Sequence, residues 1–184
     1  MRFGQKVSVI STVSCAAIAG ALITSPALAA ERNVGAKTHA KPLVPKGKAG
    51  IQARFAKELG RELNQARRAR KLAPLRGSKV LKRAARRHSM FMAQTSRLQH
   101  TGRGGSLFWQ RFVRLGYSRN ARMSEIIAKR NVCKPGDPTL IVKKWIASPP
   151  HRVLMFDRKI RYFGAGVASK SRCSLTFYTM AFGS

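Results

Sequence analysis

Three residues of this chain carry the side chains of a metal-binding or acid–base site: His100, Glu125 and His151. They are distant in the sequence, but each lies at the end of an expected element or in a loop, where functional side chains can converge. Two imidazoles and one carboxylate are the ligand set of a catalytic zinc site with an open position, and the same groups could act as acid and base. Because no HExxH motif fixes two ligands on one helix, the spacing leaves open whether the three residues share a site.

His88 is a further candidate, and whether it joins the site is left open. It lies on the apolar face of an expected helix, where a packed histidine is more common than a ligand. Ser89 follows His88 directly, but neighbouring residues on a helix point apart, so the two do not form a nucleophile and its base. No serine or cysteine is plainly paired with a histidine in this sequence.

The charge of the chain is strongly positive, with 37 lysines and arginines against 6 acidic residues and a formal charge of +31. Such a polycation attracts anionic partners, whether membrane lipid, cell-wall polymer or nucleic acid. A basic, solvated surface without a specific partner is the alternative. Nucleic acid is the least favoured partner, because the chain has no recognised nucleic-acid-binding motif and carries an export signal.

The first 29 residues are typical of a secretory signal peptide. Arg2 and Lys6 precede an uncharged run, residues 7–30, in which Ala27-Leu28-Ala29 forms an A-x-A cleavage site. A retained membrane anchor is less favoured, because Pro26 interrupts a run that is short for a membrane span. Cleavage would remove two cations and no acid, so the formal charge of +31 becomes +29. We therefore expect a secreted or periplasmic monomer without a transmembrane segment.

Cleavage would also remove Cys15 and leave two cysteines, Cys133 and Cys173. An even pair in an exported chain predicts one disulfide. A bridge that closes about forty residues contributes roughly 4 kcal/mol to stability in the chain-entropy model. An oxidised pair excludes a thiol nucleophile, and the chain has no CxxC motif for redox or zinc chemistry.

The rest of the chain divides into a flexible basic linker, residues 30–50, and one domain, residues 51–184. Apolar residues at helical spacing, with capping residues and prolines at the ends, predict four helices. The first covers residues 51–72, the second runs from a cap at Ser78 to about residue 92, and the others cover residues 106–115 and 139–147. Runs rich in β-forming residues predict strands over residues 125–128, 162–169 and 174–182. Helices first and strands afterwards indicate an α+β layered domain.

Two features of these helices bear on function. Lys82, Arg83, Arg86 and Arg87 line the polar side of the second helix, where a solvated surface is more usual than a binding site. After the fourth helix, the Pro149-Pro150 pair should end the helical path, and we expect it to turn His151 into a cleft.

Six segments appear in the order in which a known family has them: residues 63–67 with 72–75, 81–92, Gln99-His100-Thr101-Gly102, Ser124-Glu125-Ile126-Ile127-Ala128, 145–152, and 164–167 with 182–183. On these segments the chain, from about residue 58 to residue 184, resembles the CAP superfamily (cysteine-rich secretory, antigen 5 and pathogenesis-related-1 proteins). The resemblance is greatest to the bacterial SCP-like extracellular branch. It implies an α-β-α sandwich with a small, mainly antiparallel sheet.

The resemblance also implies a surface cleft, because family members hold two histidines and acidic residues there. His100, Glu125 and His151 fall on the matching positions, and a divalent metal such as zinc is the only cofactor that the family suggests. The chain departs from the family pattern at Ser124 and Ile126, on either side of the glutamate, and it has no match for the family's second glutamate. For Asp157 the family pattern favours a structural role, and whether it joins the cleft is left open.

Two functions follow as hypotheses. The favoured one is a secreted, non-enzymatic module that binds an anionic or amphiphilic partner, namely envelope lipid, cell-wall polymer or a host surface. The alternative is a metal-assisted, peptidase-like hydrolase, in which His100 or His151 is the base, Glu125 orients it or binds the metal, and a metal-bound water attacks. With one matching acid, a mechanism that uses two carboxylates has no support.

Overall fold

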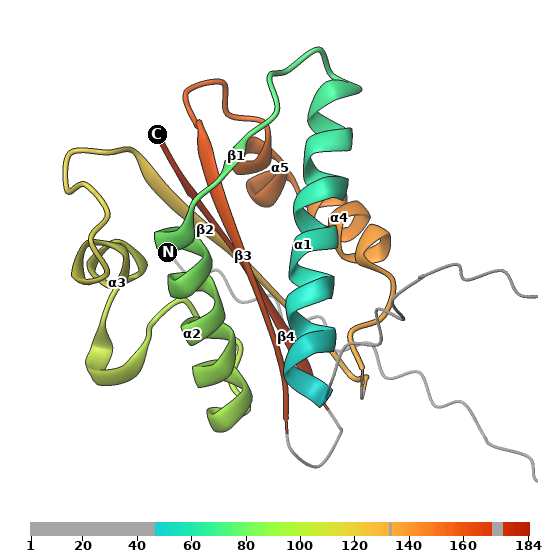
Figure 1. Ribbon diagram of the computed structural model, residues 1–184, viewed down its shortest axis with the longest axis vertical. Helices are drawn as coiled ribbons and strands as arrows, with labels where there is room; N and C mark the ends of the chain where they lie inside the picture. The colour runs from blue at the N-terminus through green and yellow to red at the C-terminus, as the bar shows by residue number, and fades with distance from the viewer. Residues whose placement is uncertain (1–46, 133, 171–174) are drawn as a thin grey trace, which may run out of the picture. The chain divides into compact units, whose positions relative to one another are not determined.

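The computed structural model describes residues 47–132, 134–170 and 175–184. The expected signal peptide and the expected Cys133–Cys173 disulfide lie outside the described residues. The elements in chain order are α1 (Gly47–Arg68), β1 (Arg76–Gly77), α2 (Lys79–Thr95), the 3-10 turn η1 (Arg103–Gly105), α3 (Phe108–Arg114), β2 (Met123–Arg130), α4 (Pro138–Ala147), α5 (Pro149–Met155), β3 (Tyr162–Ser169) and β4 (Thr176–Gly183) (Figure 1).

The four strands form one sheet in the order β1-β3-β4-β2. Strand β4 is central and antiparallel to both β2 and β3, while the two-residue β1 runs parallel to β3. The sheet is therefore mainly antiparallel, as expected. Across it, Glu125 of β2 lies opposite Ala181 of β4, which in turn lies opposite Gly164 of β3.

The sheet is covered by helices on both faces, because alternate strand residues point to opposite sides. On one face Ile126, Val167 and Met180 pack with α1, α4 and α5 around the buried Trp145. On the other face Ala181 packs against α2 and α3, and Ile127 packs farther along α2. Figure 1 shows α3 beside α2 and α4 beside α1. These three layers confirm the expected α-β-α sandwich.

Helix α2 lies directly on β3, because two glycines remove the side chains that would separate them. A Cβ atom on Gly164 would lie 2.0 Å from the backbone nitrogen of Lys82, and one on Gly166 would lie 2.2 Å from the backbone carbon of Ala85. Real Cβ atoms essentially never come so close to backbone. Ser78 caps the start of α2 by accepting from the backbone N–H of Leu81, so both the start and the depth of this helix are determined.

The role of the Pro149-Pro150 pair in the structure differs from the expected one. The fourth helix ends at Ala147, as expected, but the two prolines then occupy the first positions of α5, which includes His151. Proline is favoured at the first helical position because its φ is preset and its missing N–H would have no helical partner there. The prolines therefore begin a second helix as well as ending the first. His151 projects from this helix, and the prediction that it leaves the helical path was wrong.

Candidate functional site

Glu125 is a fully buried carboxylate at the centre of the site, with 0% of its side chain exposed. It lies on β2, on the face of the sheet that α2 covers, beside the small Ala181 of the neighbouring strand. A carboxylate in such a place is strongly destabilising unless its oxygens accept hydrogen bonds from charged or polar donors. The surrounding residues are therefore the ones that decide what this acid can do.

Arg111 neutralises this carboxylate. Its Nη2 donates to Oε2 of Glu125 at 2.7 Å, and only 12% of the arginine side chain is exposed. Its Nη1 donates to the backbone carbonyls of His100 and Ser106, each at 2.8 Å. One guanidinium of α3 thus holds both the acid on β2 and the loop that precedes α3.

His100 occupies the other oxygen of the carboxylate. Its Nδ1 lies 3.0 Å from Oε1 of Glu125, and 53% of its side chain is exposed. Since a carboxylate only accepts, Nδ1 carries the proton that is donated. The acid therefore orients the ring and leaves Nε2 as its accessible nitrogen.

His88 also belongs to the site. The residue is 1% exposed, and its Nε2 lies 2.9 Å from the carbonyl oxygen of Gln99 and 3.7 Å from Oε1 of Glu125. Burial lowers the pKa of His88, although the nearby Glu125 carboxylate acts in the opposite direction. His88 is therefore neutral near pH 7, with Nε2–H as donor and Nδ1 as an acceptor that has no partner among the described residues.

His151 lies close to His100 but does not contact the carboxylate in the described structure. Its Nδ1 is 2.9 Å from Oγ of Ser148, the residue that caps α5. Burial and the charge of His100 both lower the pKa of His151. The structure thus brings His100 and Glu125 into direct contact and places His151 within electrostatic range of His100.

Asp157 lies outside this cluster. Its carboxylate pairs with Nη1 of Arg122 at 3.3 Å and accepts from the backbone N–H of Lys159 at 2.8 Å. Its backbone carbonyl accepts from the buried Arg67. These contacts are those of a turn residue, which agrees with the structural role that the family pattern favours.

The donor set differs from that of a three-ligand metal centre. Within the described residues, no three His, Cys, Asp or Glu side chains are grouped so as to hold a metal ion. Glu125 uses its two oxygens on His100 and Arg111, so it supports one imidazole from behind, in the way that outer-shell carboxylates support metal-binding histidines. The described side chains therefore offer two imidazole nitrogens and no third ligand, which does not fit the catalytic zinc site suggested by the sequence.

Sequence reasoning missed Arg111. The residue stands among 37 lysines and arginines, and nothing in its spacing separates it from the solvated ones. Its position eleven residues after His100 becomes meaningful only when the loop folds back and α3 packs beside α2. Burial of its guanidinium, and not its residue type, identifies it.

Acidification should destabilise the protein in a way that depends on His88. Because its pKa lies below the ordinary value of 6.5 in the folded state, the unfolded chain takes up a proton at a higher pH than the native protein does. The stability from neutral His88 is thus fully present above pH 6.5 and is lost as the pH falls toward the native pKa. Urea unfolding at pH 7.5 and 5.0 should show a smaller pH effect in His88→Gln than in the original protein.

His151→Gln is the companion variant for that measurement, because the pKa of His151 is lowered in the same direction. Both single variants should reduce the loss of stability between pH 7.5 and 5.0, and the double variant should reduce it further. An unchanged pH dependence in His88→Gln would contradict the assignment of His88 as a buried neutral base.

Comparisons with known proteins agree with this fold. The family model for the cysteine-rich secretory protein (CAP) family matches residues 61–182. No curated protein sequence matches the chain. Among solved structures, the chain is similar to an outer surface protein from Borrelia burgdorferi, with 19% identity, a TM-score of 0.61, and coverage of 71% of this chain and 92% of that one.

Two further solved structures are similar in fold. An extracellular protein containing an SCP domain from Bacillus anthracis gives 21% identity and a TM-score of 0.63, covering 77% of this chain and 44% of that one. A cysteine-rich secretory protein from Staphylococcus aureus gives 17% identity and a TM-score of 0.51, covering 72% of this chain and 39% of that one. This chain thus spans less than half of the latter two proteins. Because the family model covers well over half of the sequence, the chain belongs to the CAP, or cysteine-rich secretory protein, family.

Proposed function

We propose that the protein is a secreted, non-enzymatic binding module whose basic surface attaches to an anionic partner: envelope lipid, a cell-wall polymer or a host surface. Secretion is supported by the signal-peptide pattern of residues 1–29. It is also supported by the family description and by neighbours described as an outer surface protein and an extracellular protein. Within the described residues, no helix has the length and apolar character needed to cross a membrane.

The observation that carries this proposal is that the described acidic residues are all engaged by neighbours within the protein. Each accepts a hydrogen bond or forms an ion pair: Glu58 with Arg54, Glu62 with Thr139, Glu125 with Arg111 and His100, Asp137 with Thr139, and Asp157 with Arg122. Without residues 1–29, 35 lysines and arginines face 6 acidic residues, a formal charge of +29, so few acids balance the cations at the surface. Attraction to anionic partners follows from that surplus.

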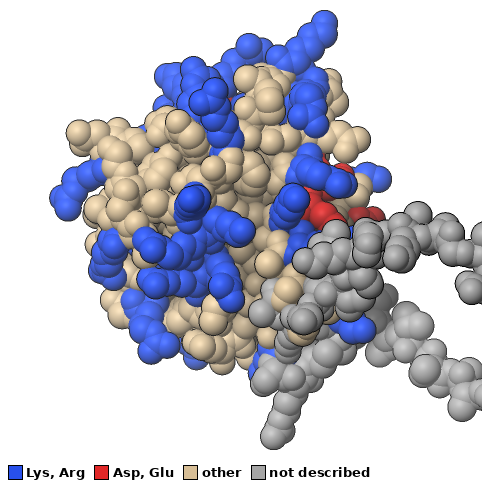
Figure 2. Space-filling model, viewed as in Figure 1, with Lys and Arg blue, Asp and Glu red and all other residues tan. Residues whose placement is uncertain are grey.

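The cations form an extended surface and not a single patch. Lys82, Arg83, Arg86 and Arg87 are all exposed on α2, opposite its apolar face. Figure 2 shows lysine and arginine side chains across this view of the molecule, whereas acidic side chains are visible in one small area. A surface of this kind suits a repetitive anionic partner, which can satisfy many separated cations at once.

The site geometry argues against hydrolysis by the expected residues. A general base needs a free lone pair within reach of water or substrate. Glu125 is buried and both of its oxygens accept hydrogen bonds from cationic or polar donors. His88 is buried and faces Gln99 and Glu125. Of the two described histidines beside the carboxylate, His100 has the exposed ring and His88 is buried. One accessible imidazole without a nucleophile is a weak catalytic set.

Binding to anionic vesicles tests the proposal. We expect the protein to sediment with vesicles containing phosphatidylglycerol and not with pure phosphatidylcholine, and to be released by about 0.5 M salt, at which surface charges are screened. Lys82→Glu combined with Arg86→Glu should weaken binding by about tenfold or more, since each cation near an anionic surface is worth about 1 kcal/mol.

The matched control is Lys143→Glu combined with Lys144→Glu, which makes the same charge change at exposed positions of α4, on the opposite face of the sheet. A smaller loss in this variant would assign binding to the α2 side. The variants His100→Ala and His151→Ala should bind as the original protein does. Binding that survives high salt but is lost in the histidine variants would contradict the proposal and favour the cleft.

Metal binding by His100 and His151 is kept as a second candidate, because each ring uses Nδ1 on a neighbour and leaves Nε2 for a ligand. The test is zinc added to untagged protein. A rise in melting temperature that either histidine-to-alanine variant abolishes would support this candidate, and no rise in the original protein would refute it. Peptide hydrolysis that requires zinc and both histidines would revive the hydrolase alternative.

A further inference from the structure

A cavity of about 470 Å³ lies between α2, α3 and the loop that joins them. This volume falls within the range of about 300–1,000 Å³ that is usual for small-molecule sites. Its apolar lining comes from α2 and from the end of α3: Ala84, Met90, Phe91 and Leu115. His100 and His151 do not line the cavity, whereas His88 and Arg111 of the candidate site do.

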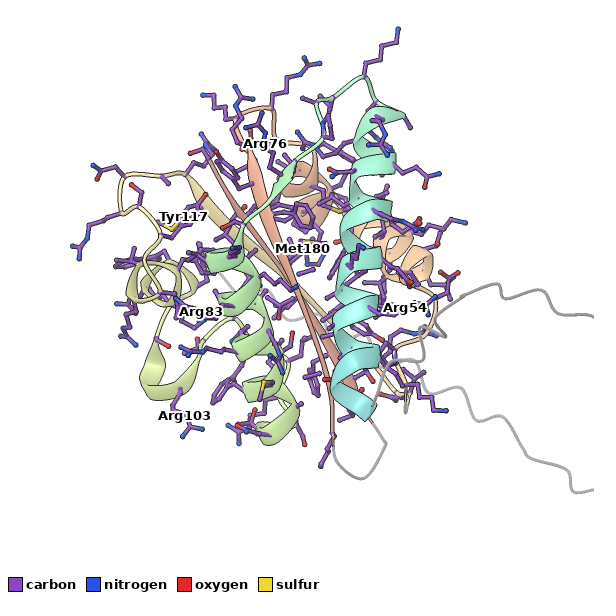
Figure 3. All side chains as sticks on the ribbon, viewed as in Figure 1. Arg54, Arg76, Arg83, Arg103, Tyr117 and Met180 are labelled. Carbon is purple, nitrogen blue, oxygen red and sulfur yellow. The ribbon has the colours of Figure 1, made fainter. Side chains whose placement is uncertain are left out.

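The walls of this cavity are held in place at both ends. Arg83 of α2 donates from Nη2 to the backbone carbonyl of Leu115 at 2.9 Å, which joins α2 to the end of α3. Arg111 binds the backbone carbonyls of His100 and Ser106, which fixes the loop. Figure 3 labels Arg83 on α2 and Arg103 on the loop between α2 and α3. A cavity with fixed walls can bind a ligand without the entropic cost of ordering them first.

The polar lining of the cavity is cationic. Four arginines contribute to it, from α2, the loop and α3: Arg87, Arg103, Arg111 and Arg114. The described residues that line it include no acidic one. Arg111 is already paired with Glu125, whereas Arg87, Arg103 and Arg114 are exposed and their side chains have no ion-pair partner among the described residues. Cations gathered around an apolar floor attract an anion that also has an apolar body.

The cavity wall also contains a buried histidine with an unpaired ring nitrogen. His88 lines the same cavity, is 1% exposed, and has an Nδ1 without a hydrogen-bond partner in the described residues. Because its Nε2 donates to Gln99, Nδ1 is an acceptor. Buried acceptors are costly when unsatisfied, but 0% of the His88 side chain is exposed, so a donor in the cavity would reach Nδ1 only after a movement of the ring or the loop.

We propose that this cavity binds a small organic anion, with an acidic group held by Arg87, Arg103 and Arg114 and a compact aromatic or aliphatic body lying on Met90, Phe91 and Leu115. The proposal deepens the proposed function and rests on it in taking the partner to be anionic. The size of the cavity, about 470 Å³, favours a single small molecule over a polymer or a bilayer, which would contact the exposed arginines without filling the apolar floor. The test below distinguishes binding of a small molecule in the cavity from binding of a bilayer to the surface.

The test compares two fluorescent probes of nearly the same shape. 1-Anilinonaphthalene-8-sulfonate has an anionic group, an N–H donor and an aromatic body, whereas N-phenyl-1-naphthylamine lacks only the sulfonate. In about 0.15 M salt, where the Debye length is about 8 Å, the anionic probe should bind with a stoichiometry of one. Its affinity should exceed that of the uncharged probe by about tenfold or more, because charge-assisted hydrogen bonds are the strong ones.

Three variants locate the binding. Arg103→Glu combined with Arg114→Glu should weaken the anionic probe by about tenfold or more and leave the uncharged probe nearly unchanged. Gln94→Trp places a large side chain at an exposed lining position and should weaken both probes. Arg61→Glu, on α1 at the other face of the sheet, should change neither by more than about twofold, as expected for a screened surface charge.

The outcomes separate this proposal from the proposed function. Probe binding that Gln94→Trp does not weaken, equal affinity for the two probes, or an equal effect of Arg61→Glu would overturn the cavity site. A far-ultraviolet and near-ultraviolet circular dichroism spectrum of each variant confirms that it is folded. Vesicle binding without probe binding would leave the basic surface as the only partner site, and probe binding without vesicle binding would support the cavity while refuting the surface proposal.

Discussion

Replacing Arg111 with methionine should lower the free energy of unfolding by about 3–5 kcal/mol, the cost of removing one partner from a buried ion pair. Glu125 has 0% of its side chain exposed, and it would lose its closest cationic partner, at 2.7 Å. The backbone carbonyls of His100 and Ser106 would also lose their common donor. Urea unfolding near pH 7 measures the effect.

Arg114→Met is the matched control for that variant, because Arg114 lies on the same helix and is exposed. It should change stability by no more than about 0.5 kcal/mol, as is usual at surface positions. Adding Glu125→Gln to Arg111→Met should recover part of the loss, since the buried charge is then removed. Equal stability of Arg111→Met and Arg114→Met would show that the ion pair does not support the fold.

Replacing Gly164 with alanine should destabilise the protein by about 3 kcal/mol or more, at the upper end of overpacking effects. The new Cβ would lie 2.0 Å from the backbone nitrogen of Lys82 and 2.2 Å from the backbone carbon of Leu81. Backbone cannot swing aside as a flexible side chain can, so α2 would have to move away from β3. That movement would also displace His88 from Glu125, because the histidine lies on the same helix.

Gly77→Ala is the control, since a Cβ at Gly77 would have nothing within 4 Å. Its melting temperature should remain close to that of the original protein, whereas that of Gly164→Ala should fall by roughly 10 °C or more, given about 4 °C per kcal/mol for a domain of this size. If alanine at position 164 were as well tolerated as at position 77, direct contact between α2 and β3 would not be what sets the depth of the helix.

The layered fold can be predicted because its signals are local. The sequence predicts a strand over residues 162–169, and β3 has those bounds. Its aromatic residues and Val167 favour a strand, and its glycines indicate a close approach of another backbone. The cap at Ser78 is predicted from its residue type and its place before an apolar period, and its hydroxyl does accept from Leu81. The spacing of apolar residues and the choice of capping residues depend only on neighbours in the sequence. Both can therefore be recognised without the structure.

Elements that depend on distant partners cannot be predicted in the same way. Strand β1 has only two residues, and it exists because it pairs with Tyr162 and Phe163 far along the chain. The Pro149-Pro150 pair predicts the end of a helix, but in the structure it also begins α5. Proline cannot donate a backbone hydrogen bond to the helix before it, but its fixed φ suits the first turn of a helix that begins with it. The residue type alone therefore does not say whether a helix ends or begins at this pair.

By itself the sequence determined the α+β class, the cationic character and the family, because composition, period and ordered segments are properties of the chain as written. It also identified His100 and Glu125, which the fold brings to 3.0 Å. The tertiary structure alone decided that His88 is buried beside that carboxylate and that Arg111 neutralises it. The physical reason is that burial turns one arginine among many into the counter-ion of a desolvated acid, and burial is a property of packing and not of residue type.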